Sequence, residues 1–255
     1  HWDADVLIWP EFALTLYGQD AVAVTDLLSR RGEASQTNVV VGMPDVHWQD
    51  QERYQVFNSA QGFGQASGKF AKHHLVPFGD YVPLQNYLRG LIGFFDLPMS
   101  NASRGARQQA NIMLTLSGQD QIIEVALGIC YEIAYGDFLR RQAETSGLLL
   151  TISNDTWFGG SIGPHQHMQI AQMRALENGR WLLRATNNGV TGIVNHRGEI
   201  TAELPQFEAS VLRGEIEVMK GRTPFSKIGD IPALFLLTVL LVITIRRRRW
   251  TIFSS

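Results

Sequence analysis

The feature that most constrains this sequence is an apolar run that ends at the chain's only cysteine. Residues 122–129 are interrupted by a single charge, Glu124, and then give way to Cys130 and the polar residues after it. A short apolar run bounded by polar residues is typical of a buried strand. Such a strand, ending in a turn, would lift the Cys130 sulfur out of the edge of a sheet.

The cysteine itself allows two interpretations. Because Cys130 has no second cysteine to pair with, it is either a small buried hydrophobic residue or a free thiol with a chemical role. Unpaired cysteines are among the most buried residue types, which favours the first interpretation. Other parts of the chain favour the second.

Apolar runs of strand length alternate with helical patterns along the chain. Helical spacing predicts helices over 19–31, 135–144 and 165–178, with Gly32 as the stop of the first. This alternation predicts an α/β fold with a mixed sheet or a stacked pair of sheets. The other predicted strands cover 6–9, 39–43, 54–60, 148–153, 181–185, 190–195 and 211–218.

Two charged residues stand at further candidate strand ends. Glu11 follows the predicted strand 6–9 directly after Pro10. It is either a solvated turn residue or a carboxylate at the sheet edge where open α/β folds place their chemistry. Lys72 lies in the proline-containing loop 69–83. It is either an ordinary solvated lysine or a fixed positive charge aimed at a developing oxyanion.

Glu11, Lys72 and Cys130 together would form a complete set of groups for acyl transfer. A thiol needs a base and a cationic neighbour before it becomes a good nucleophile. A carboxylate can accept the proton, and a lysine can stabilise both the thiolate and the tetrahedral oxyanion. Spacing alone does not identify the set, because any chain of this length contains these three residue types.

Three competing interpretations remain open. A cysteine–histidine hydrolase would use His165 or His167, but both lie at the start of a helix with no carboxylate at an obvious spacing. A metal site built from those histidines, or from His73 and His74, is weaker, because two histidines do not close a coordination set. The third is a membrane-anchored binding domain with a degenerate site. We expect no metal and no cofactor, and a net charge of −2 gives no indication of a nucleic-acid partner.

The C-terminal residues differ from the rest of the chain. Residues 231–245 carry no charge, and four arginines follow at 246–249. The uncharged stretch is shorter than the roughly 20 residues that span a bilayer, but preceding residues and snorkelling arginines can extend it. We predict a catalytic domain over 1–224, a transmembrane helix over 225–249 with cytoplasmic arginines, and a short tail over 250–255. A buried C-terminal helix is the alternative. The first residue is His1, so we take the chain to be a fragment or a processed piece.

Several local sequences resemble a known superfamily. Residues 9–11 (Trp-Pro-Glu), 72–79 and 128–132 (Gly-Ile-Cys-Tyr-Glu) are similar to the three catalytic blocks of the nitrilase, or carbon–nitrogen hydrolase, superfamily. More narrowly, they resemble the apolipoprotein N-acyltransferase family of bacterial membrane enzymes, as do 153–159, 174–180 and 184–189. That family carries a multi-helix membrane domain ahead of this region, which these 255 residues do not contain.

The resemblance implies a fold and a set of site residues. The implied fold is an α-β-β-α sandwich followed by one membrane helix. Glu11 would be the general base, Lys72 the stabiliser of thiolate and oxyanion, and Cys130 the nucleophile. Tyr131 and Glu132 would support the site, and Asp80 stands where the family usually has the longer glutamate.

The implied reaction transfers an acyl chain from a phospholipid, through a Cys130 thioester, to the α-amino group of the diacylglyceryl-cysteine of an apolipoprotein. The enzyme would lie in the bacterial inner membrane with its catalytic domain on the extracytoplasmic side. Aromatic residues on two segments are candidates for a lipid entrance: Phe94, Phe95, Trp157 and Phe158. The alternative is a membrane-tethered amidase or nitrilase that uses water against a small substrate.

Overall fold

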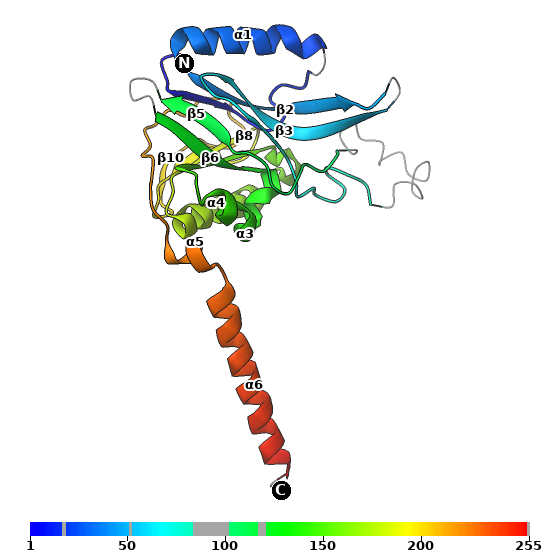
Figure 1. Ribbon diagram of the computed structural model, residues 1–255, viewed down its shortest axis with the longest axis vertical. Helices are drawn as coiled ribbons and strands as arrows, with labels where there is room; N and C mark the ends of the chain where they lie inside the picture. Colours follow the sequence, from blue (N-terminus) through cyan, green and yellow to red (C-terminus); the bar gives the residue numbers. More distant parts are fainter. Residues whose placement is uncertain (17–18, 51–52, 84–101, 117–120, 254–255) are drawn as a thin grey trace.

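Two β-sheets stack face to face between layers of helix in the computed structural model (Figure 1). It describes residues 1–16, 19–50, 53–83, 102–116 and 121–253, so Phe94 and Phe95 lie outside the described residues. Helix α1 (Gln19–Ser35) covers the outer face of one sheet. Helices α3 (Gly136–Gln142) and α4 (Gly163–Asn178) cover the outer face of the other. The predicted α-β-β-α sandwich is confirmed.

The first sheet has four strands in the order β1-β2-β3-β4. Strand β1 pairs parallel with β2, and the other neighbours are antiparallel. The hairpin formed by β2 and β3 is much longer than the flanking strands (Figure 1). The strands are β1 (Val6–Trp9), β2 (Asn38–Trp48), β3 (Tyr54–Gly64) and β4 (Lys69–Ala71).

The second sheet has six strands in the order β10-β9-β8-β7-β6-β5. Its central strands β6, β7 and β8 run parallel, so their carboxyl ends reach the same edge of the sheet. Strands β5, β9 and β10 are antiparallel to their neighbours. The strands are β5 (Ile112–Leu116), β6 (Gln121–Ile129), β7 (Leu148–Ser153), β8 (Leu182–Thr186), β9 (Gly192–Val194) and β10 (Ile200–Glu203).

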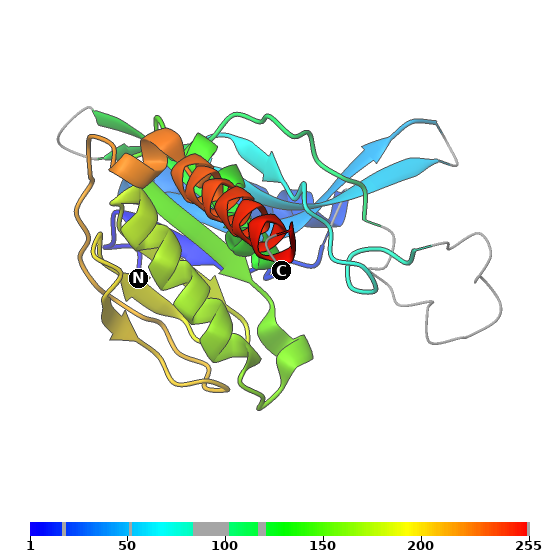
Figure 2. The same cartoon turned by 90° about the horizontal axis from the view of Figure 1, so that it is seen from below.

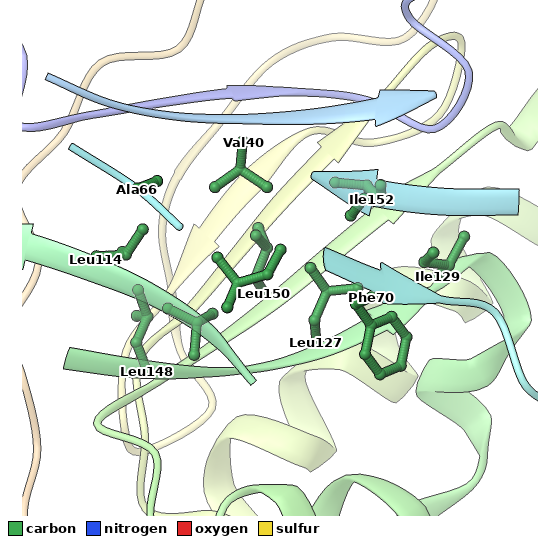
Figure 3. Packing of buried hydrophobic residues seen from close by; sticks show 12 residues of the cluster. Val40, Ala66, Phe70, Leu114, Leu127, Ile129, Leu148, Leu150 and Ile152 are labelled. Carbon is green, nitrogen blue, oxygen red and sulfur yellow. The ribbon is translucent and has the colours of Figure 1, made fainter. Parts of the chain in front are cut away.

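The central strands are buried on both faces. In β6, Leu127 and Ile129 enter the core between the two sheets, whereas Ala126 packs toward α3 and α4. Strand β7 repeats this pattern, with Leu150 in the inter-sheet core (Figure 3). Successive side chains of a strand alternate between faces, so a strand covered on both faces must be apolar at every position. This explains the continuous apolar run before Cys130.

Helix α1 and residues 211–218 differ from the prediction. Helix α1 passes through Gly32 and ends at Ser35, because Gly32 packs so tightly on the neighbouring strand that a Cβ there would lie 2.7 Å from the Gly64 Cα. Residues 211–218, predicted as a closing strand, form no strand. Their apolar residue Ile216 packs against the inter-sheet core without joining a sheet.

The C-terminal helix begins later than predicted. A short helix, α5 (Pro224–Ile228), ends at Gly229, whose φ of +56° breaks the helical path. Helix α6 (Ile231–Phe253) then projects away from the sandwich (Figures 1 and 2) and includes residues predicted as a tail. Within the described part of the chain, none of the helices has both the length and the apolar character needed to cross a membrane. The predicted transmembrane helix is therefore not confirmed.

Candidate active site

The carboxyl ends of four strands from both sheets supply one group of polar residues. Glu11 follows β1, Cys130 follows β6, Asp155 follows β7 and Asn187 follows β8. The Asn187 side chain donates to the backbone carbonyl of Glu11 at 2.9 Å, which joins the two sheets at this edge. Parallel strands thus place their terminal residues together, as open α/β folds do.

Glu11 is a buried carboxylate, only 3% exposed, and not a solvated turn residue. Its Oε1 accepts a hydrogen bond from Asn58 Nδ2 at 2.6 Å, and its Oε2 accepts one from the backbone N–H of Asn154 at 2.6 Å. The turn that carries it lies directly on β2, where a Cβ at Gly42 would come within 2.3 Å of the Pro10 carbonyl oxygen. Close packing and two donors therefore fix both carboxylate oxygens.

Lys72 is a buried cation between two carboxylates. Its Nζ lies 3.4 Å from Glu11 Oε1 and 2.7 Å from Asp80 Oδ2, and the side chain is 2% exposed. Burial alone would lower the pKa of Lys72, but the nearby Glu11, Cys130 and Asp80 outweigh it and raise the pKa. Lys72 therefore keeps its positive charge throughout the physiological pH range.

Asp80 reaches Lys72 in spite of its short side chain. The same Oδ2 that contacts Lys72 also accepts a hydrogen bond from the backbone N–H of Val76 at 2.8 Å. That bond holds the carboxylate within the loop that follows Lys72. The shorter aspartate thus still supplies a negative charge next to the lysine.

Cys130 lies at the junction between β6 and the short 3-10 helix η2 (Cys130–Ala134). Its φ of +55° is unusual for a residue with a side chain. Burial of the thiol and the charge of Glu11 raise the pKa of Cys130 to about 12, against the opposing effects of Lys72 and a Ser153 hydrogen bond. At neutral pH the sulfur is therefore protonated, and a base must remove the proton before it can attack.

Glu132 connects the loop that follows Lys72 to the turn that carries Cys130. It is fully buried; its Oε1 accepts from the backbone N–H groups of His73 and His74 at 2.8 and 2.9 Å. Its Oε2 accepts from the N–H of Ile129 at 3.0 Å. One carboxylate thus holds the residues next to Lys72 and those next to Cys130. Tyr131, by contrast, is exposed, with its ring 6.2 Å from that of Tyr135.

The two described aromatic candidates for a lipid entrance are both exposed. Trp157 and Phe158 lie on a short 3-10 helix, η3 (Asp155–Phe158), and Trp157 is 67% exposed. The Phe158 ring lies 6.3 Å from the ring of His167. The Phe158 ring therefore lies near His167, and Trp157 has most of its surface open to solvent.

A buried network next to Cys130 was missed from the sequence. His167 Nδ1 lies 3.0 Å from Asp155 Oδ1, and Arg184 Nη2 lies 2.6 Å from Asp155 Oδ2. The sequence shows no carboxylate at an obvious spacing from His167, but Asp155 reaches it from the turn after β7, twelve residues earlier in the chain. The other ring nitrogen, Nε2, lies 3.1 Å from the backbone carbonyl oxygen of Cys130. His167 therefore contacts the backbone of the cysteine. His165 is exposed.

A large cavity lies beside this constellation in the described part of the chain. It has a volume of about 1060 Å³ and is lined by residues that include His74, Arg107 and Phe138, but not by Glu11, Lys72 or Cys130. A smaller cavity of about 210 Å³ is lined by Pro10 and Asn187, next to the Glu11 turn. We place the candidate active site at Glu11, Lys72 and Cys130, because reactive groups meet there and not in either cavity.

The sequence matches a protein-family model described as carbon-nitrogen hydrolase over residues 1–222. It is 44% identical over 247 residues to an apolipoprotein N-acyltransferase of Pseudomonas paraeruginosa, covering 97% of this chain and 47% of that protein. It is 39% identical over 261 residues to the protein of that name from Vibrio vulnificus, covering 98% and 50%. The chain thus spans about half the length of the curated relatives it matches.

Solved structures share the fold at low sequence identity. A crystal structure of a carbon-nitrogen hydrolase from Helicobacter pylori G27 superposes with a TM-score of 0.60 at 14% identity, covering 82% of this chain and 76% of that one. An amidase from Nesterenkonia sp. superposes with a TM-score of 0.54 at 18% identity, covering 80% and 74%. Both likenesses concern the sandwich.

Proposed function

Because this chain belongs to the carbon–nitrogen hydrolase family, we propose that it is the catalytic part of an enzyme that acylates apolipoproteins. The acyl chain comes from a phospholipid and passes through a thioester on Cys130. It ends on the α-amino group of an N-terminal diacylglyceryl-cysteine. Identity of 44% to an apolipoprotein N-acyltransferase along nearly the whole chain favours this reaction over hydrolysis of a small amide.

The observation that carries the proposal is the buried Lys72 ammonium beside Glu11 and Cys130. In the first step the Cys130 sulfur attacks the ester carbonyl and its proton passes to Glu11. Lys72 stabilises the negative oxygen of the tetrahedral intermediate, which lies in a site of low dielectric. Collapse of the intermediate breaks the ester C–O bond, and the leaving lysophospholipid oxygen takes the proton from Glu11. A thioester remains.

The second step returns the cysteine to its resting state. The acceptor amine attacks the thioester carbonyl and gives a proton to Glu11, with Lys72 again facing the oxyanion. Collapse breaks the C–S bond, so an amide forms and the sulfur recovers its proton. Asp80 helps to keep Lys72 charged. Glu132 holds the loop after Lys72 next to the turn at Cys130, and Tyr131 lines the approach to the sulfur. No cofactor enters either step.

We also propose a membrane location. The large apolar side chains of α6 between Ile231 and Ile245 are exposed to solvent, and Arg246 to Arg249 follow this uncharged stretch. Exposed apolar surface of this extent is typical of a segment that contacts lipid. In this proposal α6 attaches residues 1–224 to the bacterial inner membrane, with the arginines on the cytoplasmic side and the catalytic domain on the extracytoplasmic side.

Intact-mass spectrometry after incubation with phospholipid, without an acceptor, tests the reaction. We expect an added acyl mass that neutral hydroxylamine removes, and no adduct on Cys130→Ala. A diacylated lipopeptide with a free amine should then discharge the adduct. A folded protein whose thiol reacts with iodoacetamide but gains no acyl mass would favour hydrolysis of a small C–N substrate. A folded protein with an unreactive thiol would favour a binding domain.

The exposed aromatics near the site give a second prediction. Replacing Trp157 and Phe158 together by serine should reduce acylation by phospholipid vesicles about tenfold, because about 1.4 kcal/mol of contact with lipid is lost. Acylation by a water-soluble ester should be unchanged. Trp48→Ser is the matched control, since Trp48 is also exposed but lies at the end of the β2–β3 hairpin. Equal loss with both acyl donors would contradict a lipid-entrance role.

A further inference from the structure

The buried network next to Cys130 has no role in the two chemical steps above. It consists of Asp155, His167 and Arg184, all of them less than 5% exposed. Burying a histidine and an arginine around one carboxylate costs free energy of desolvation, which suggests that the network has a function. His167 Nε2 approaches the Cys130 carbonyl oxygen at 3.1 Å, and Asp155 Oδ1 accepts a hydrogen bond from Ser153, which in turn hydrogen-bonds to the Cys130 thiol.

The direction of this hydrogen bond is fixed by chemistry. A carbonyl oxygen can only accept, so His167 Nε2 must carry a proton and donate it. The other ring nitrogen, Nδ1, lies 3.0 Å from Asp155 Oδ1 and 3.0 Å from Arg184 Nη2. A protonated Nδ1 can donate to Asp155, and an unprotonated Nδ1 can accept from Arg184. The Nε2–H donor is therefore present with or without a proton on Nδ1. Since Nε2 donates to the backbone, His167 is not the base that takes the cysteine proton.

A bond to the Cys130 carbonyl also orients the next amide. The carbonyl of Cys130 and the N–H of Tyr131 belong to one planar trans peptide unit, in which they point in opposite directions. His167 is 3% exposed and lies on the buried side of this peptide, whereas Cys130 and Tyr131 are partly exposed. Holding the carbonyl toward His167 therefore turns the Tyr131 N–H toward the open side of the cysteine.

The backbone at this point needs such a restraint. A positive φ at a residue with a Cβ persists only where the surroundings hold it, and Cys130 has a φ of +55°. Glu132 fixes the residue before Cys130 through the Ile129 N–H, and His167 fixes the peptide after it. Asp155 fixes His167 in turn, and Arg184 fixes Asp155.

We infer that His167 is a positioning residue, whose hydrogen bond to the Cys130 carbonyl aims the Tyr131 N–H at the oxyanion formed on the acyl carbon. Lys72 supplies the charge at that oxygen and the Tyr131 amide supplies a directed hydrogen bond. This inference rests on the proposed function only in taking Cys130 as the nucleophile of an acyl transfer. It applies to either of the two tetrahedral intermediates.

Two substitutions in the full chain separate positioning from support of the fold. His167→Gln places an amide nitrogen near the position of Nε2, so the bond to the Cys130 carbonyl is kept. His167→Asn places it near Nδ1, so the contact with Asp155 is kept and the carbonyl bond is lost. The first readout is the burst of p-nitrophenol when p-nitrophenyl butyrate acylates Cys130, which passes through an oxyanion. The second is alkylation by iodoacetamide, which displaces iodide at a saturated carbon and forms no oxyanion.

We expect His167→Asn to acylate about 100-fold more slowly, the loss typical of one oxyanion donor, and to alkylate at nearly the wild-type rate. His167→Gln should acylate within about fivefold of wild type. The inference is overturned if His167→Asn loses both reactions equally, if it loses neither, or if His167→Gln acylates as slowly as His167→Asn. Should His167→Asn not fold, the inference is still overturned if folded His167→Gln alkylates at the wild-type rate but acylates about 100-fold more slowly.

A wild-type chain that alkylates but shows no burst would refute the proposed acyl transfer and this inference with it. That outcome differs from a failure of the inference alone. In the latter case the wild-type burst is present and His167→Asn shows it undiminished.

Discussion

Lys72→Met is expected to slow acylation of Cys130 by about 10³-fold or more, a larger loss than that of a single neutral oxyanion donor. Methionine has nearly the shape of lysine without its charge, so neither the thiolate nor the oxyanion is stabilised. The substitution also leaves the carboxylates of Glu11 and Asp80 buried without their cation, 3.4 and 2.7 Å from the former ammonium. Removing one partner of a buried ion pair costs about 3–5 kcal/mol, so the free energy of unfolding should fall by a similar amount.

Single-turnover mass spectrometry and urea denaturation measure the two effects of Lys72→Met separately. Lys69→Met is the matched control, because Lys69 pairs with Asp45 on the surface and should affect acylation and stability little. Acylation is measured at a temperature where circular dichroism shows both variants to be folded. A folded Lys72→Met variant that acylates within tenfold of wild type would exclude the oxyanion role of the lysine.

Glu11→Gln is expected to change two reactions of the same sulfur in opposite directions. Acyl transfer should fall by about 10²–10⁴-fold, because glutamine cannot accept the proton from the thiol. Alkylation by iodoacetamide at pH 8 should become faster. The negative charge of Glu11 helps to raise the pKa of Cys130 to about 12, so its removal lowers that pKa and increases the thiolate fraction at pH 8.

The pH dependence of alkylation tests the sign of this effect. For the wild type, the rate should keep rising with pH from 7 to beyond 10 without a plateau, since the thiol titrates near pH 12. For Glu11→Gln, the midpoint should lie at lower pH. Glu33→Gln, on the exposed surface of α1, should leave the profile unchanged. A Glu11→Gln midpoint equal to or above that of the wild type would contradict the interaction between Glu11 and Cys130.

Most strands, and the grouping of Glu11, Lys72 and Cys130 at strand ends, could be predicted because local patterns indicate them. The run that becomes β6 is apolar on both faces of a buried strand, and Glu11 and Cys130 each stand directly after such a run. Strand β7 was predicted with its observed bounds, 148–153, for the same reason. The resemblance of the surrounding motifs then assigned Lys72, which lies in a loop without a strong periodic signal.

The supporting contacts could not be predicted, because they join residues far apart in the chain. Asn58 lies inside β3 with nothing in its local sequence to indicate that it donates to Glu11. His167 appeared to lack a carboxylate because Asp155 is in another element and only the turn after β7 brings it near. Residues 211–218 show the converse case, since they were predicted as a strand but pair with neither sheet in the described structure.

The division of the site between the two sheets has a consequence for how this protein matures. Glu11 and Lys72 follow β1 and β4 of the four-stranded sheet, whereas Cys130 follows β6 of the six-stranded sheet. Neither sheet alone contains both Cys130 and Glu11, and Glu132 makes its bonds to the backbone of His73 and His74 only when the sheets have docked. A newly made chain therefore carries an ordinary thiol until its sandwich closes. If Cys130 acts as proposed, the ability to acylate arises in the same event that completes the fold, and a half-folded molecule has no assembled site.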